Sequence, residues 1–345
     1  MIRVLVAEDS PTARRLLVEM LTSDAAIVVV GEAVNGAEAV EMAERLHPDL
    51  ITMDVQMPEL DGLEATMRIM GKVPTPIIIV SARASDSEIE LSLEATRAGA
   101  LMVLAKPEGP LSPRFDEQRE QLVAMVKVMS GVKVVRRWGA SAAVRSRFTP
   151  VSVPLISTER PRLVAIGAST GGPAALRDLL NALPSTFNAP VLVVQHISKG
   201  FVGGLANWLG ANTSLPVRVA TSSELVRPGV VYIAPDDQHL GIRDNGRILL
   251  SSAAPVGLFR PSASHLFESA AGAYGGAMIA VILTGMGDDG VSGLRAVHAA
   301  GGLVVAQDEA TSVVYGMPRE AVRAGVVSAV LPLQDIAPRL VEAVK

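Results

Sequence analysis

The stretch LITMDVQMPELDG, residues 50–62, moves from an apolar run to an acid and then into a turn rich in Pro and Gly. Short apolar runs bounded by turn residues are typical of buried strands. Similar runs lie on both sides of it: IRVLVAED and IVVVGEAV come earlier, PIIIVSA and LMVLAKP come later, and helical patterns such as PTARRLLVEML fill the gaps. Alternating strands and helices from residue 1 to about 107 predict a doubly wound parallel α/β sheet.

The same alternation restarts at Leu163. The runs RLVAIGAS, VLVVQHI, VVYIAP, MIAVILTGM and LVVAQ are typical of strands, and PAALRDLLNAL, SASHLFESAAGAY and GVSGLRAVHAAG are typical of helices. The segment HLGIRDNGRILLS predicts a hairpin with Asn-Gly at its turn. We therefore expect a second, mostly parallel α/β domain that also carries a hairpin.

The domain boundaries follow from a change in composition. No acid occurs between Glu120 and Glu159, and small residues and Pro follow one another there without a clear period. This predicts an interdomain linker at residues 131–160, between domains at 1–130 and 161–345. We expect its charge to be solvated, and the alternative is contact with an acidic partner or a membrane surface. The basic residues of this region are Lys127, Lys133, Arg136, Arg137, Arg145 and Arg147.

Length and composition limit the class of protein. The chain has 345 residues, enough for two domains, and 49% of them are hydrophobic although only 3% are aromatic. A net charge of −4 gives no reason to expect nucleic-acid binding, and the absence of cysteine excludes disulfides and thiolate chemistry. The N-terminus reaches two acids too early for a signal peptide, and no apolar run could span a bilayer. We expect a soluble cytoplasmic protein.

Polar side chains follow four strands of the first predicted sheet. Glu8 and Asp9 end the first strand, Asp54 the third, Ser81 the fourth and Lys106 the fifth. Sites in open α/β sheets form beyond the carboxyl ends of the strands, so we expect these groups to meet. Three carboxylates suit Mg²⁺, Asp54 would be a nucleophile that becomes an aspartyl phosphate, and Lys106 and Ser81 would hold the phosphoryl oxygens. The alternative is a set of solvated strand ends or an inconsequential Ca²⁺ site.

The motifs VLVAEDS, MDVQMPELDG, IVSA and AKP make residues 1 to about 130 resemble a response-regulator receiver domain. The resemblance implies a flavodoxin-like (βα)5 fold in which Asp54 accepts phosphate from a histidine kinase. It implies Mg²⁺ bound by Glu8, Asp9, Asp54 and the backbone carbonyl of Gln56. Receivers often carry an aromatic switch residue three positions before the lysine, where this chain has Val103, so an aromatic flip cannot be its output signal.

The stretch AIGASTGG, residues 165–172, admits three interpretations. Glycines between a strand and a helix can face a phosphate, but no Lys-Ser/Thr pair follows and G-x-G-x-x-G is absent. Residues 167–171 match the G-x-S-x-G elbow of α/β hydrolases, with Asp289 and His298 following in order, but His298 falls inside the helical pattern LRAVHAAG. The third interpretation again uses strand ends.

In that third interpretation, Ser169 ends the strand VAIG, His196 ends VLVVQ, and Asp288 and Asp289 follow MIAVILTGM. These groups share one rim if the strands are parallel. A neutral imidazole can take the serine proton, and a carboxylate can orient the imidazole. Glycines at 171–172 and 285–287 would expose N–H groups as an oxyanion hole. We expect the remaining histidines His47, His239 and His265 to be structural.

The motifs GASTGG, VVQHI, YIAP, FRPSASHLF, ILTGMGDDG and QDEATSVVYGMPREA resemble the catalytic domain of the chemotaxis protein-glutamate methylesterase (CheB-type) family. A receiver followed by this domain resembles the full architecture of that family. The resemblance implies Ser169 as nucleophile, His196 as base and Asp289 as acid. It also implies that Met286 gives a backbone N–H to the oxyanion and that Thr170 supports the site, with no cofactor needed for hydrolysis.

The same resemblance implies substrate and partners. The family hydrolyses γ-glutamyl methyl esters on methyl-accepting chemotaxis receptors, releasing methanol, and many members deamidate receptor glutamines. The implied kinase is of the CheA type. We expect a monomer that meets the membrane only through receptors and binds no nucleic acid. The family commonly has APGDRHL where this chain has APDDQHL, so Asp236 and Gln238 leave the choice of receptor open.

A phosphoryl acceptor and a hydrolase on one chain suggest how activity is controlled. Our hypothesis is that the unphosphorylated receiver covers the rim carrying Ser169 and that phosphorylation of Asp54 loosens this interface. Two other functions stay open. The chain could be a phosphorylation-controlled receptor-docking module with a vestigial hydrolase site, or a nucleotide-binding enzyme that uses GASTGG.

Overall fold

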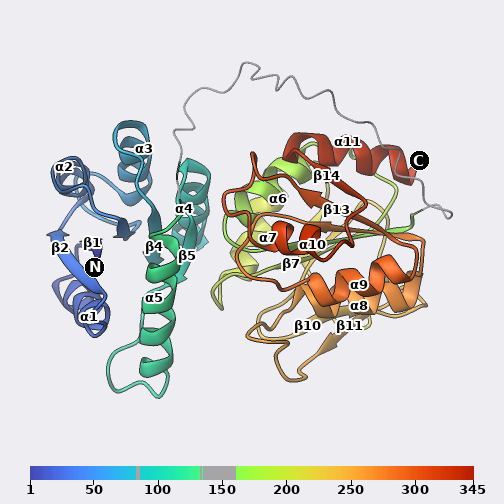
Figure 1. The fold of residues 1–345 in the computed structure, drawn as a ribbon, viewed down its shortest axis with the longest axis horizontal. Coiled ribbons are helices and arrows are strands. Elements are labelled where there is room, and N and C mark those ends of the chain that lie inside the picture. The colour runs from blue at the N-terminus through green and yellow to red at the C-terminus, as the bar shows by residue number, and fades with distance from the viewer. Residues whose placement is uncertain (83–85, 133, 135–160) are drawn as a thin grey trace. The chain divides into compact units, whose positions relative to one another are not determined.

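The computed structural model describes residues 1–82, 86–132, 134 and 161–345, and the chain divides into two compact units, Met1–Thr149 and Pro150–Lys345 (Figure 1). Of the predicted linker at 131–160, all but three residues lie outside the described residues, and its basic side chains from Lys133 to Arg147 are among those outside. No helix among the described residues has the length and apolar character needed to cross a bilayer.

The first unit is built on a five-stranded sheet in the order β2-β1-β3-β4-β5, and every strand pair is parallel. Helix α3 packs between α2 and α4, and α1 packs on α5. The sheet is the doubly wound arrangement that the alternating pattern predicts. Its strands are β1 (Ile2–Ala7), β2 (Ile27–Ala33), β3 (Leu50–Met53), β4 (Ile77–Ser81) and β5 (Met102–Ala105), and its helices are α1 (Pro11–Thr22), α2 (Gly36–Leu46), α3 (Gly62–Lys72), α4 (Asp86–Ala98) and α5 (Phe115–Met129).

Local sequence explains where these helices begin. Side-chain oxygens of Ser10, Asn35 and Asp61 accept hydrogen bonds from backbone N–H groups in the first turns of α1, α2 and α3. Such caps satisfy donors that have no partner inside the helix. Every residue of β3 and β4 is buried, as expected for parallel strands covered on both faces.

The second unit contains a seven-stranded sheet in the order β14-β13-β12-β6-β7-β9-β8, again with every pair parallel. The predicted hairpin forms a separate two-stranded sheet of β10 (His239–Ile242) and β11 (Ile248–Ser251), which packs on α8. The strands of the large sheet are β6 (Leu163–Ala168), β7 (Val191–Gln195), β8 (Val217–Val219), β9 (Val231–Ile233), β12 (Met278–Ile282), β13 (Leu303–Gln307) and β14 (Ala329–Leu331). The helices are α6 (Gly172–Asn181), α7 (Val202–Ala211), α8 (Ala263–Tyr274), α9 (Val291–Ala299), α10 (Met317–Arg323) and α11 (Leu333–Val344).

Strand order determines where each unit can hold a site. In the first sheet β1 lies between β2 and β3, and in the second β6 lies between β7 and β12. In each case the chain runs to one side of the first strand and later returns to the other side. Crevices form at such points beyond the carboxyl ends of the strands. The loops that follow β1 and β3 in one unit, and β6, β7 and β12 in the other, therefore meet.

Candidate active site and phosphorylation site

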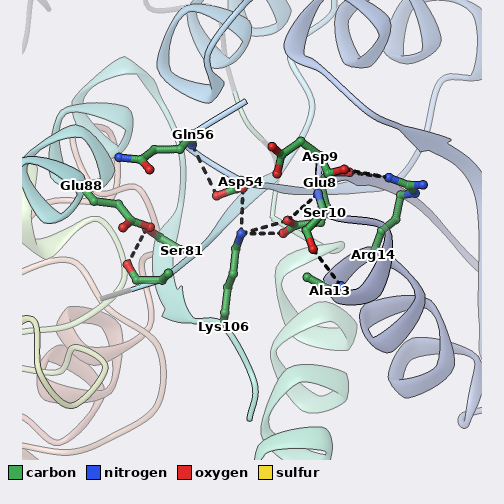
Figure 2. Close-up of polar contacts among 11 residues, drawn as sticks. Glu8, Asp9, Ser10, Ala13, Arg14, Asp54, Gln56, Ser81, Glu88 and Lys106 are labelled. Carbon is green, nitrogen blue, oxygen red and sulfur yellow. Dashed lines mark hydrogen bonds and ion pairs between the residues drawn. The ribbon is translucent and has the colours of Figure 1, made fainter. Parts of the chain in front are cut away.

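The first unit gathers its acids where β1 and β3 end. Carboxylate oxygens of Glu8, Asp9 and Asp54 lie within 4.8 Å of one another (Figure 2). Glu8 and Asp54 are 0% and 2% exposed, whereas Asp9 faces solvent. Two buried carboxylates beside a third, exposed one form a site that a cation can reach from outside.

Lys106 lies between the two buried acids. Its ammonium nitrogen donates to Glu8 Oε1 at 2.9 Å and to Asp54 Oδ2 at 2.8 Å. Burial and the charge of Asp54 raise the pKa of Glu8 to about 7. Burial also raises the pKa of Asp54, although the hydrogen bond from Lys106 opposes this. Burial would lower the pKa of Lys106, but its hydrogen bonds to Asp54 and Glu8 outweigh burial and raise it. The site is therefore short of positive charge.

The donor set fits Mg²⁺. The three side chains offer the oxygen ligands that this hard cation prefers. Among the described residues Glu8 Oε2 is buried and accepts no hydrogen bond, although the Lys106 nitrogen lies 2.9 Å from it. A buried carboxylate oxygen without a hydrogen bond is a ready metal ligand. The Gln56 N–H donates to Asp54 Oδ1 at 3.4 Å, which keeps the residue after β3 close to the acids.

Ser81 is engaged elsewhere. Its hydroxyl donates to Glu88 Oε1 at 2.8 Å and to the Ala82 carbonyl at 3.1 Å, so in Figure 2 it is bonded to α4 and not to Asp54. Both Ser81 and Glu88 are buried. To hold a phosphoryl group on Asp54, as the sequence predicts, the hydroxyl would have to leave Glu88.

In the second unit, the N-terminus of α8 holds the carboxylate of Asp289. Asp289 accepts from the Ser262 hydroxyl at 2.7 Å, from the Ala263 N–H at 2.7 Å and from the Ser264 N–H at 3.1 Å. Its other contact is with His196 Nε2 at 2.8 Å. Burial would raise the pKa of this carboxyl, but the contact with His196 and the bonds from α8 hold it well below its usual range. Asp289 is thus a fixed negative charge.

His196 is held on two sides. Because its Nε2 lies against a carboxylate, the hydrogen of a neutral ring belongs on Nε2, leaving Nδ1 as the basic nitrogen. Nδ1 is buried and has no partner among the described residues. The ring of Phe259 stacks on the imidazole at 4.1 Å between centroids and 5° between planes. The imidazole is therefore oriented while its Nδ1 stays available.

Ser169 is tied to His196 through the backbone. The sheet ladder ends with the His196 N–H donating to the Ala168 carbonyl at 2.9 Å. Beyond it, Gln195 Nε2 donates to the carbonyls of Ser169 and His196, each at 2.8 Å. The Ser169 side chain is partly exposed, so a substrate could reach it. Its hydroxyl has no hydrogen bond to Nδ1 in the described residues, a looseness common in sites without substrate.

The loop after β12 packs against the serine. The Ser169 N–H donates to the Thr284 carbonyl at 3.0 Å, and the Thr284 hydroxyl donates to the Thr170 carbonyl at 2.9 Å. A methyl group added at Gly285 would lie 2.7 Å from Ser169 Cβ, so only glycine allows this approach. Within the described residues the neighbouring Met286 N–H has no protein acceptor. That donor is free to bind an oxyanion.

The structure brings together His196, Asp289 and the loops of Ser169 and Met286, and it separates other candidates from them. Asp288 is exposed, and His298 is exposed on α9. Three groups that support the site were not predicted from the sequence: Gln195, Phe259 and the 262–264 cap of α8. Gln195 directly precedes His196, and Ser262 is a typical capping residue, so both carried a weak signal.

Fold and site together define a class: a response regulator joined to an α/β unit with a hydrolase-type site. Residues 164–340 match the model of the CheB methylesterase family, and residues 4–112 match that of the response regulator receiver domain. The crystal structure of the Thermotoga maritima CheB methylesterase catalytic domain is similar at a TM-score of 0.51 and 42% identity, covering 53% of this chain and 98% of that domain.

Two relatives are similar to this chain over nearly its whole length. Protein-glutamate methylesterase/protein-glutamine glutaminase 4 of Myxococcus xanthus is 55% identical over 342 residues, which cover 99% of this chain and 97% of the relative. Protein-glutamate methylesterase/protein-glutamine glutaminase 3 of Anaeromyxobacter dehalogenans is 51% identical, with coverage of 99% and 98%. The chain belongs to the CheB methylesterase family and carries a receiver domain at its N-terminal end, which confirms the predicted family and fold class.

Proposed function

We propose that this protein hydrolyses γ-glutamyl methyl esters on chemotaxis receptors and that phosphorylation of Asp54 activates it. The observation that carries the hydrolase is the buried contact of 2.8 Å between His196 Nε2 and Asp289, next to the strand end that bears Ser169. The relatives' names supply the substrate class, a protein glutamate ester, with protein glutamine as a second substrate.

Each group has a role in the proposed reaction. Ser169 Oγ attacks the ester carbonyl carbon while His196 Nδ1 takes the hydroxyl proton, and Asp289 stabilises the imidazolium. The Met286 N–H donates to the carbonyl oxygen as it becomes negative, with Thr170 holding the adjoining loop. When the tetrahedral intermediate collapses, the C–O bond to the methoxy group breaks and His196 returns the proton, so methanol leaves.

Water completes the cycle. It attacks the acyl-serine as His196 Nδ1 removes its proton, and the proton then passes to Ser169 Oγ as the acyl bond breaks. The products are a free glutamate and the original serine. A glutamine side chain would follow the same steps with ammonia as the leaving group. Both the ester and the amide carry the same acyl group bonded to a small leaving group.

The receiver supplies the control in this proposal. Asp54 Oδ would attack the phosphorus of a phosphohistidine on a CheA-type kinase, and the bond to the histidine nitrogen would break. Mg²⁺, held by Glu8, Asp9, Asp54 and the Gln56 carbonyl, would offset the charge of the incoming phosphoryl group. Lys106 lies 2.8 Å from Asp54, within reach of a phosphoryl oxygen. The proposal includes a receiver domain at residues 1–130, an interdomain linker at 131–160 and a catalytic domain at 161–345.

The test is methanol release from methylated receptor membranes. Ser169→Ala should abolish release, whereas Ser292→Ala, which changes an exposed serine on α9, should leave it unchanged. Release at the wild-type rate from Ser169→Ala would contradict the proposed nucleophile. If the wild type also released none while still binding receptors, the chain would instead be a receptor-docking module with a vestigial site.

A further inference from the structure

A tight turn beside the catalytic histidine presents an apolar tip to solvent. Val256 and Phe259 pair through two backbone hydrogen bonds of 3.1 Å, and Gly257 between them adopts φ +61°, a conformation that favours glycine. Leu258 at the tip is 92% exposed and Val256 is 39% exposed. Among the described residues of the second unit, Leu258 is the most exposed large hydrophobic side chain.

This turn is attached to the site. The Phe259 ring, one residue from Leu258, is the ring that stacks on His196 at 4.1 Å. The following residue, Arg260, donates from Nε and Nη2 to Asp237 Oδ1 at 2.8 and 2.6 Å. Its Nη1 donates to the carbonyls of Ser252 and Ala253 at 3.3 and 3.1 Å. Both sides of the turn's base are therefore held, and little ordering is needed for its tip to bind a partner.

We propose that the turn 256–259 docks the protein part of the substrate and that Leu258 packs against apolar side chains beside the glutamyl ester. This inference rests on the proposed function. The occupant follows from position: Leu258 directly precedes Phe259, whose ring lies 4.1 Å from the imidazole of the proposed base, so a protein whose side chain reaches that base comes close to the turn. The apolar surface of Leu258, which is 92% exposed in the free protein, leaves water only when such a partner covers it.

The test compares two substrates and two leucines. Leu258→Ser is measured on methylated receptor membranes and on p-nitrophenyl acetate, a small ester without a protein surface. Leu225→Ser is the matched control, because Leu225 is also an exposed leucine, at 50%. It pairs with Arg247, which lies next to the hairpin turn, whereas His239 lies at the other end of the hairpin. Ser169→Ala is measured in parallel on both substrates.

For Leu258→Ser we expect KM for the receptor substrate to rise about tenfold, since burying a leucine is worth roughly that factor. Hydrolysis of the small ester should not change, and Leu225→Ser should change neither reaction. If Leu258→Ser leaves the receptor kinetics unchanged, or reduces activity equally on both substrates, the docking role is overturned. If Ser169→Ala is inactive in the same experiment, the proposed function still stands. Full activity of Ser169→Ala on receptor membranes would instead overturn the proposed function itself.

Discussion

Gln195 shows how one amide can hold a proposed nucleophile, Ser169, and its proposed base, His196, together. The strand pairing ends at Ala168 and Gln195, and beyond it the Gln195 side chain, 3% exposed, joins the carbonyls of Ser169 and His196. It can lie there because Gly172 has no side chain: a methyl group at Gly172 would lie 2.0 Å from Gln195 Oε1. The last glycine of GASTGG thus makes room for a side chain from the neighbouring strand.

Gly172→Ala should therefore impair both stability and turnover. Displacing a buried amide in a packed core costs about 1–3 kcal/mol, and the shifted carbonyls would move Ser169 relative to His196. Gly272→Ala is the control, because Gly272 is exposed in α8 with nothing within 4 Å, and it should stabilise the fold by about 0.5–1 kcal/mol. Denaturant unfolding and methanol release measure the two effects. Full activity of Gly172→Ala would refute the role given to Gln195.

The depressed pKa of Asp289 gives a pH prediction. The folded protein binds this proton less tightly than the unfolded chain, whose carboxyl has a pKa near 3.8. Its contribution to stability is complete above that pH and is lost as the pH falls below it. Asp289→Asn should cost about 3 kcal/mol at neutral pH, and the difference from wild type should shrink below about pH 4. A difference that is constant into the acid range, by denaturant unfolding, would contradict the account.

At the scale of elements, β4 and α4 of the receiver are linked through the hydrogen bond from Ser81 to Glu88. Two buried groups joined in this way favour the arrangement in which Ser81 is turned from Asp54. This chain has Val103 at the position where receivers often carry an aromatic switch residue. The hydrogen bond between Ser81 and Glu88 is therefore a candidate for the contact that changes on phosphorylation.

Glu88→Ala should shift the receiver toward its phosphorylated arrangement. An intramolecular hydrogen bond contributes about 0.5–1.5 kcal/mol net, so its loss should raise the phosphorylated fraction at limiting phosphodonor by up to roughly tenfold. Glu90→Ala, which changes an exposed acid on the same helix, should have no effect. Phosphorylation is followed by mass spectrometry of the intact protein. Equal phosphorylation of both variants and wild type would exclude a restraining role for Glu88.

Most elements were predictable because their burial gives a strong pattern. The central strands of both sheets are fully buried apolar runs, and the Asn-Gly turn marked the hairpin. The edge strands β8 and β14 were missed because each has three residues and no fully buried one, so the sequence carries little apolar signal there. The amphipathic helix α11 was not predicted either, because Pro338 lies inside it and interrupts the usual helical pattern.

The candidate site was predictable only in part, for a related reason. The residues at strand ends, such as Asp54 and Asp289, are located by the strands themselves. The groups that support them come from elements distant in the chain, as Ser262 and Phe259 do for the Asp289–His196 pair. No local sequence pattern predicts that α8 begins beside the end of β12, so these contacts could be found only in the three-dimensional structure.

At the scale of the whole molecule, the two units carry complementary chemistry. One gathers acids and a lysine that suit the proposed phosphoryl acceptor, and the other gathers a histidine and an aspartate that suit the proposed hydrolase site. The matches to the receiver model at residues 4–112 and to the CheB methylesterase model at residues 164–340 fall one in each unit. We propose that phosphorylation of the first unit controls hydrolysis by the second.

The most direct test measures methanol release by the full-length protein from methylated receptor membranes, with Mg²⁺ present and with or without acetyl phosphate as phosphodonor. Wild type should release methanol several-fold faster with acetyl phosphate, and Asp54→Asn should release it at one rate in both conditions. Stimulation of Asp54→Asn equal to that of wild type, or a phosphorylated wild type that is no faster, would contradict control of the hydrolase through Asp54.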